Sequence, residues 1–205
     1  MRACRALRTC LPLIPALLVL VLATANPAQA TTLIRAGLES LTAQNELAVH
    51  GRVLDIYSYW DATHSQILTD VRLKPAEVLK GTLPATDLKL TLVGGTVGST
   101  TMLLIGAPTL VPGHDYVVFI SQTDLLPDQP PVMTVPDHIQ GVFDVKSDPG
   151  SPASGTRAVS QALTHPLLPD AAGITDVPGG EHGYDLKDMF TRVRELAARG
   201  NTEVR

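Results

Sequence analysis

ELAVHGRVLDIYSYW (residues 46–60) and SQILTDVRLK (residues 65–74) are the two stretches that decide the fold of this chain. In the second stretch, the expected inward side chains are Ile67, Thr69, Val71 and Leu73, and the expected outward ones are Gln66, Asp70, Arg72 and Lys74. Alternation with a period of two is typical of a strand with one buried face. The turn residues 61–64 between the two stretches predict that they form a hairpin.

The first stretch also alternates, but its apolar side chains change from one face to the other. The parity changes from Leu47, Val49 and Val53 to Leu54 and Ile56, with Gly51 near the change. A strand that changes face near a glycine is usually bulged or coiled. We therefore expect a long, bent strand that joins both sides of a small barrel.

Further apolar segments predict more strands, each preceded by turn residues. They are DLKLTLV (87–93), TTMLLI (100–105), DYVVFIS (115–121) and QGVFDVK (140–146). Pro75 is expected to interrupt the strand that begins at Ile67, because proline cannot donate to a ladder. Successive strands without a helical pattern between them predict a mainly β fold, either an antiparallel barrel or a sandwich. Of these we expect a small antiparallel β-barrel of the oligonucleotide/oligosaccharide-binding (OB) type, which the resemblance described below also implies.

Helices are expected on both flanks of the barrel. Residues 33–47, around GLESLTAQNEL, predict a short N-terminal helix, and residues 184–200 predict an amphipathic C-terminal helix that ends at Gly200. Its apolar stripe consists of Leu186, Met189, Phe190, Val193 and Ala197. We expect this stripe to pack on the barrel; the alternative is the groove of a partner. The predicted barrel domain spans residues 31–146, and residues 147–183 predict a connector rich in glycine and proline.

Residues 1–30 predict a secretory signal peptide. Three arginines precede an apolar run, and the segment ends in Ala-Gln-Ala, so we expect cleavage after Ala30 and a periplasmic or extracellular protein without a stable membrane anchor. Both cysteines lie in the leader, which leaves the mature chain without disulfides or thiolate sites. The leader holds three of 16 basic and none of 20 acidic residues, so the mature net charge is about −7. A negative charge argues against nucleic acid as a partner.

The order of these segments resembles a group of uncharacterised exported bacterial proteins. The most specific shared elements are Val-Leu-Lys-Gly at 78–81, Gly-Gly-Thr-Val-Gly at 94–98 and Pro-Gly-x-x-Tyr at 112–116. This resemblance implies export and brings no activity with it. More remotely, the first two strands are similar to those of the netrin-like barrel of tissue inhibitors of metalloproteinases. That resemblance implies the barrel, but not the inhibitory wedge, because the expected new terminus is Thr31 and no cysteine is available.

The glycines that precede Ser99, Thr100 and Thr101 look at first like a phosphate-binding loop. A Walker loop needs a lysine and a strand-to-helix turn, whereas strand-like TTMLLI follows here. We expect a strand turn at 94–98, and a helix from Ser99 would reopen the nucleotide question. We expect no nucleotide, cofactor or metal, because the six histidines are scattered, and no catalytic residue stands out, because no nucleophile motif occurs.

The one possible binding surface is aromatic. Tyr57 and Tyr59 share a strand face, and Trp60 lies beside a turn. Exposed aromatic side chains stack on ligands or anchor interfaces; the alternative is that they cover one end of the barrel. A barrel with exposed edges and no recognisable catalytic set predicts non-catalytic binding, with an exported protein as the expected partner. The alternatives are an inhibitor or accessory factor of a secreted protease, and a hydrolase with a site assembled from loops.

Overall fold

The computed structural model describes residues 35–83, 86–125, 129–147, 155–164, 179–180 and 182–203. The expected signal peptide and most of the expected connector lie outside these residues. In the part of the chain that is described, no helix is both long and apolar enough to span a membrane.

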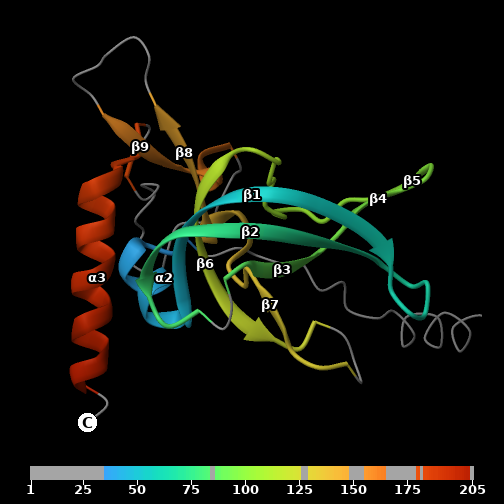
Figure 1. Cartoon of the computed structure of the whole chain (residues 1–205), viewed down its shortest axis with the longest axis horizontal. Coiled ribbons are helices and arrows are strands. Elements are labelled where there is room, and N and C mark those ends of the chain that lie inside the picture. The colour runs from blue at the N-terminus through green and yellow to red at the C-terminus, as the bar shows by residue number, and fades with distance from the viewer. Residues whose placement is uncertain are drawn as a thin grey trace, which may run out of the picture. The chain divides into compact units, whose positions relative to one another are not determined.

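The described chain is mainly β, with a short helix before the strands and a long helix after them (Figure 1). The strands are β1 (Leu47–Trp60), β2 (Ile67–Lys80), β3 (Leu88–Val93), β4 (Gly95–Val97), β5 (Thr100–Met102), β6 (Asp115–Thr123), β7 (Val132–Thr134), β8 (Val142–Ser147), β9 (Thr156–Ser160) and β10 (Tyr184–Asp185). The helices are α2 (Leu38–Gln44), α3 (Leu186–Glu203) and the 3-10 turns η1 (His138–Gly141) and η2 (Gln161–Thr164).

The main sheet has the order β10-β9-β8-β6-β1-β2-β3, and its paired strands are antiparallel. β7 pairs with the end of β6, beyond the residues that β8 covers. β4 and β5 form a separate two-stranded hairpin that projects at the end of the molecule opposite α3 (Figure 1). A mainly β, antiparallel fold with two flanking helices is thus confirmed.

The predicted bulge in β1 is confirmed, but the predicted change of face is wrong, because Val49, Val53 and Ile56 all pack in the same apolar cluster. Val53 pairs with Leu73 and Asp55 with Arg72, so Leu54 is the extra residue of the bulge. Leu54 is therefore 38% exposed, while Ile56 lies opposite Val71 and faces the interior. The extra residue restores the inward alternation for the rest of the strand.

The predicted interruption at Pro75 is wrong, because β2 continues through it to Lys80. Pro75 pairs with Gly51 beside a second bulge, and an irregular ladder position tolerates the missing N–H. Gly51 is required there, since a Cβ would lie 2.5 Å from Leu73 Cδ2 and 2.6 Å from the Lys74 carbonyl.

Two apolar clusters form on opposite faces of the curved sheet. The first lies inside the curve and contains Val53, Val71, Leu73, Leu90, Val118 and Ile120. The second joins the sheet to the helices and contains Leu41, Ala48, Phe119, Phe143, Met189 and Val193. Both faces of β6 are buried as a result. The prediction that the apolar stripe of the C-terminal helix packs on the sheet is confirmed.

Several predicted boundaries were wrong. α3 continues through Gly200 to Glu203, and α2 ends at Gln44. Residues 155–164, expected within the connector, instead form β9 and η2, because β9 completes a ladder along β8. In TTMLLI only Thr100–Met102 is a strand.

The predicted strand turn after Leu92 is confirmed. Gly94 and Gly95 bend the chain from β3 into β4, and Gly98 and Ser99 form the turn into β5. All three glycines have positive φ, of 103°, 132° and 60°. No helix begins at Ser99, so the feature that would support a phosphate-binding loop is missing.

Candidate functional site

The most exposed apolar segment of the described chain is the three-residue run that follows β5, here called the 103–105 loop. Leu103 is 88% exposed, Leu104 42% and Ile105 91%. The loop ends where the Gly106 carbonyl accepts a hydrogen bond from the Ile139 amide at 3.0 Å. Two large side chains are thus held almost wholly in water on an anchored backbone. Fully burying such a side chain is worth about 1.5–3 kcal/mol.

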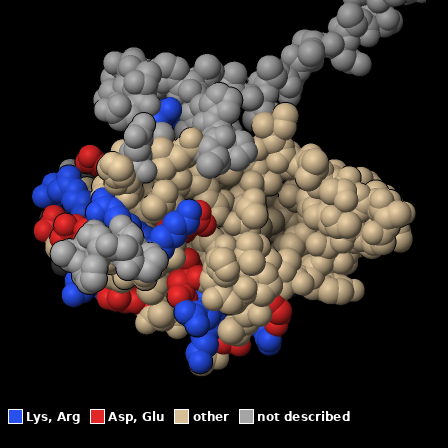
Figure 2. Space-filling model, turned by 90° about the horizontal axis from the view of Figure 1, so that it is seen from above, with Lys and Arg blue, Asp and Glu red and all other residues tan. Residues whose placement is uncertain are grey.

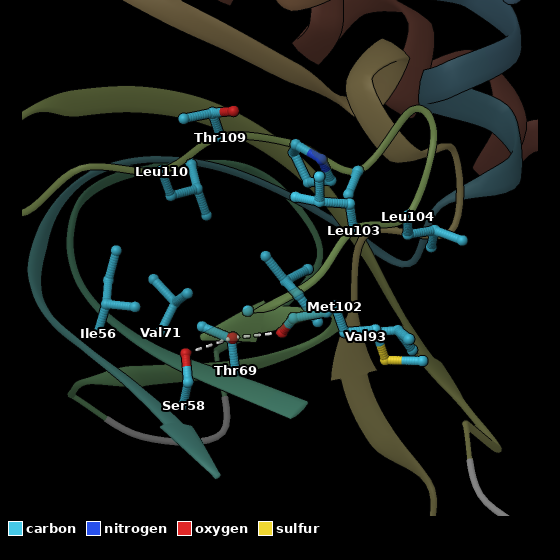
Figure 3. A pocket seen from close by; sticks show the side chains of 15 residues that line it. Ile56, Ser58, Thr69, Val71, Val93, Met102, Leu103, Leu104, Thr109 and Leu110 are labelled. Carbon is cyan, nitrogen blue, oxygen red and sulfur yellow. Dashed lines mark hydrogen bonds between the residues drawn. The ribbon is translucent and has the colours of Figure 1, made fainter. Parts of the chain in front are cut away.

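A groove of about 320 Å³, here called the end groove, opens beside this loop. Ile56 and Val71 form one wall, and Leu110 lies across from them (Figure 3). Met102, Leu103 and Leu104 form the side next to the hairpin. The groove is therefore mainly apolar, which suits contact with an uncharged group.

A chain of hydroxyl groups attaches the hairpin to the wall of the end groove. The Thr69 hydroxyl donates to the Gly94 carbonyl at 2.5 Å, and Ser58 Oγ lies 2.8 Å from Thr69 Oγ1 (Figure 3). The Ile67 amide lies 3.3 Å from Met102 Sδ. Gly95 packs directly on the hydroxyls, since a Cβ would lie 2.2 Å from Thr69 Oγ1. The position of the 103–105 loop therefore depends on close packing at Gly95.

The segment that forms the β4–β5 hairpin and the 103–105 loop is uncharged. Between Lys89 and Asp115 the sequence contains no Lys, Arg, Asp or Glu. Figure 2 shows the charged side chains gathered on one side of the visible face, while its right-hand side, where Figure 1 shows the hairpin, is formed by other residues. A partner that contacts this segment would meet apolar and hydroxyl groups rather than charges.

The predicted aromatic surface lies at the same end, on the hairpin formed by β1 and β2. Tyr57 is 69% exposed and stacks on Tyr59, with ring centroids 5.9 Å apart. Trp60 stacks on His64 of the turn at 6.0 Å. The structure thus brings the tyrosines together as predicted and places Trp60 beside the turn, but the described lining of the end groove includes none of the three.

Hydrogen bonds fix the surroundings of these aromatic residues. The Tyr59 hydroxyl donates to Asp70 Oδ1 at 3.2 Å, and burial, reinforced by Asp70, raises the pKa of Tyr59. The Asp61 carboxylate accepts hydrogen bonds from Thr63, Ser65 and the Gln66 amide in the turn. The Thr63 hydroxyl contributes most to lowering the pKa of Asp61 to about 2. Asp61 is therefore ionised at neutral pH, and its carboxylate holds the turn.

A second hollow, of about 490 Å³, contains the residue types that a hydrolase would need. His114, Asp115 and Ser160 line it. Asp115 is engaged by the Arg52 guanidinium through two hydrogen bonds, of 2.9 and 2.6 Å, which lowers the pKa of the carboxyl. Within the described residues, no hydrogen bond joins His114 to Ser160, and no three acidic, histidine or cysteine side chains cluster as metal ligands. This geometry gives no support to a catalytic assignment.

Sequence reasoning missed the 103–105 loop because its apolar run was interpreted as the continuation of a strand. The available signal was the absence of charge on both sides of it, from residue 90 to residue 114. No known protein-family model matches the sequence, and no curated protein matches it.

Proposed function

We propose that this is an exported, non-catalytic binding protein that recognises another exported protein through the end groove and the 103–105 loop. The observation that carries the proposal is the nearly complete exposure of Leu103 and Ile105 beside an apolar groove. Monomeric proteins rarely display such a contiguous apolar patch unless it is an interaction site. The export expected from residues 1–30 would put the partner outside the cytoplasm.

The chemistry of the groove favours binding over catalysis. Its described lining holds apolar residues, glycines, a proline and the hydroxyls of Ser58, Thr69 and Thr109, and no titratable side chain. A general acid or base must lie within hydrogen-bond reach of the reacting group. Tyr57, at the same end of the molecule, would extend the contact surface along the outer face of β1.

We further propose that the sheet closes as a barrel of OB type through β3 and β7. Leu92 and Val93 of β3 line the same hollow of about 250 Å³ as Thr134 and Val135, at the end of β7. Thr91, on the free edge of β3, is only 3% exposed. Side-chain packing would then protect this edge in place of a hydrogen-bonded ladder. The end groove would become the mouth of that barrel, a common place for ligand sites.

The test is affinity capture from the native exported fraction with immobilised full-length protein. A variant that carries both Leu103→Ser and Ile105→Ser should lose the retained protein, because it removes the apolar contact while keeping an exposed backbone. Leu54→Ser is the matched control, since Leu54 is exposed on the β1 bulge outside the end groove. Thermal unfolding should show all three proteins folded. Equal retention by the double variant would refute the proposal.

A further inference from the structure

The hydroxyl chain on the wall of the end groove has a defined direction. Thr69 has one hydroxyl proton, and the Gly94 carbonyl accepts it at 2.5 Å. The Ser58 hydroxyl must therefore donate its own proton to Thr69 Oγ1, 2.8 Å away. The oxygen of Ser58, which lines the groove, is left with lone pairs and no proton to offer. The groove thus presents an acceptor.

The other groups around the groove restrict what can meet this acceptor. The nearest walls, Ile56, Val71 and Leu110, are apolar. A Lys or Arg side chain entering here would lose hydration without meeting a carboxylate, because no acidic residue lines the groove. The matching group is an uncharged N–H or O–H donor on an apolar body.

The size of the groove indicates one side chain rather than a cofactor. Its volume of about 320 Å³ lies at the low end of the roughly 300–1,000 Å³ typical of small-molecule pockets. Single aromatic anchors in small apolar pockets dominate many protein interfaces. Tryptophan fits best, because its indole N–H is a donor only and the rest of the ring is apolar.

We propose that the end groove is a socket for one tryptophan side chain of the partner, with the indole N–H donating to Ser58 Oγ. This proposal rests on the proposed function and names the group that the end groove recognises. The 103–105 loop would lie around the inserted ring. Contacts in such a position add little binding energy themselves but exclude water from the central anchor.

The test is an NMR titration of the full-length protein with indole and with 1-methylindole, which lacks the donor. Wild-type protein should bind indole about three- to tenfold more tightly, the contribution of one hydrogen bond. Ser58→Ala should reduce the affinity for indole by the same factor and leave 1-methylindole unchanged. Ser147→Ala, a hydroxyl deletion on an exposed residue far along the sheet in β8, is the matched control.

The shifted amides should include those of Ile56, Val71 and Leu110. The socket would be overturned if the wild type bound both probes with equal affinity, or if Ser58→Ala bound indole as tightly as the wild type does. It would also be overturned if a millimolar concentration of probe shifted no amide signal of the groove residues. The double variant at Leu103 and Ile105 separates the two proposals. If the double variant loses protein capture but the wild-type protein does not bind indole, the socket is wrong and the proposed function stands.

Discussion

Gly95 shows how a single residue positions the whole candidate site. Its φ of +132° is a conformation that side chains with a Cβ rarely adopt, and the space beside it is occupied by hydroxyl groups. An added Cβ would lie 2.2 Å from Thr69 Oγ1 and 2.6 Å from Ser58 Oγ. The glycine is thus required by backbone conformation and by close approach together.

We therefore expect Gly95→Ala to lower the free energy of unfolding by about 2–4 kcal/mol, because strain and displaced hydrogen bonds add. Gly98→Ala is the matched control, since Gly98 also has positive φ, of 60°, but no atom within 4 Å of its Cβ position. Gly98→Ala should lower the free energy of unfolding by only about 1 kcal/mol. Urea unfolding measures both, and equal losses would contradict the role of the hydroxyl pair.

Gly95→Ala should also weaken indole binding, because the same change disturbs Ser58. A variant that loses stability but keeps the full affinity for indole would show that the hydroxyl chain tolerates the displacement.

At the scale of elements, the spacing of apolar residues correctly predicted which side chains of β2 and α3 are buried. Ile67, Val71 and Leu73 lie inward as expected, and the stripe of α3 is buried at Met189 and Val193. The connector prediction failed at β9 because its pairing with β8 is a tertiary contact that composition does not reveal. The interruption predicted at Pro75 failed because a bulge absorbs the proline.

The Val-Leu-Lys-Gly element is explained by its contacts with the end of α2 and with Glu46. Lys80 Nζ donates to the Thr42 and Asn45 carbonyls at the end of α2, where free carbonyls attract a cation. Gly81 has a φ of +82°, and a Cβ would lie 2.5 Å from the Glu46 carbonyl. These roles were invisible in the sequence, because they join residues 35 or more positions apart.

The docking of α3 on the sheet contains a titratable contact. The His50 ring on β1 lies 5.3 Å from the Phe190 ring, and its buried Nε2 has no hydrogen-bond partner among the described residues. Burial lowers the pKa of His50, although Asp115 and Glu77 act in the opposite direction. The neutral ring is therefore the form that the folded protein favours.

Because the folded pKa lies below 6.5, His50 contributes stability that is present above pH 6.5 and is lost as the pH falls through the folded pKa. The free energy of unfolding should decrease from pH 7.5 to pH 5, and His50→Phe should reduce this decrease. Parallel profiles for wild type and His50→Phe would contradict the assignment.

At the scale of the whole molecule, charge and apolar exposure lie at different places. Arg194 of α3 pairs with Glu77, whereas Leu103 and Ile105 lie in the uncharged segment 90–114, which the charged residues Lys89 and Asp115 bound. The aromatic pair Tyr57 and Tyr59 could be predicted from the sequence, but the groove could not, because four separate segments form it.

This separation makes the salt dependence of partner binding a test of which surface is used. Ionic attraction between exposed groups is screened within about 10 Å at 0.1 M salt and within about 3 Å at 1 M. Contact through Leu103, Ile105 and the end groove involves no charge on this protein, so retention of the captured partner should be unchanged between about 0.1 and 1 M NaCl. The measurement is the amount retained at each concentration. Elution by salt would assign binding to the charged side instead, since apolar burial does not weaken as salt rises.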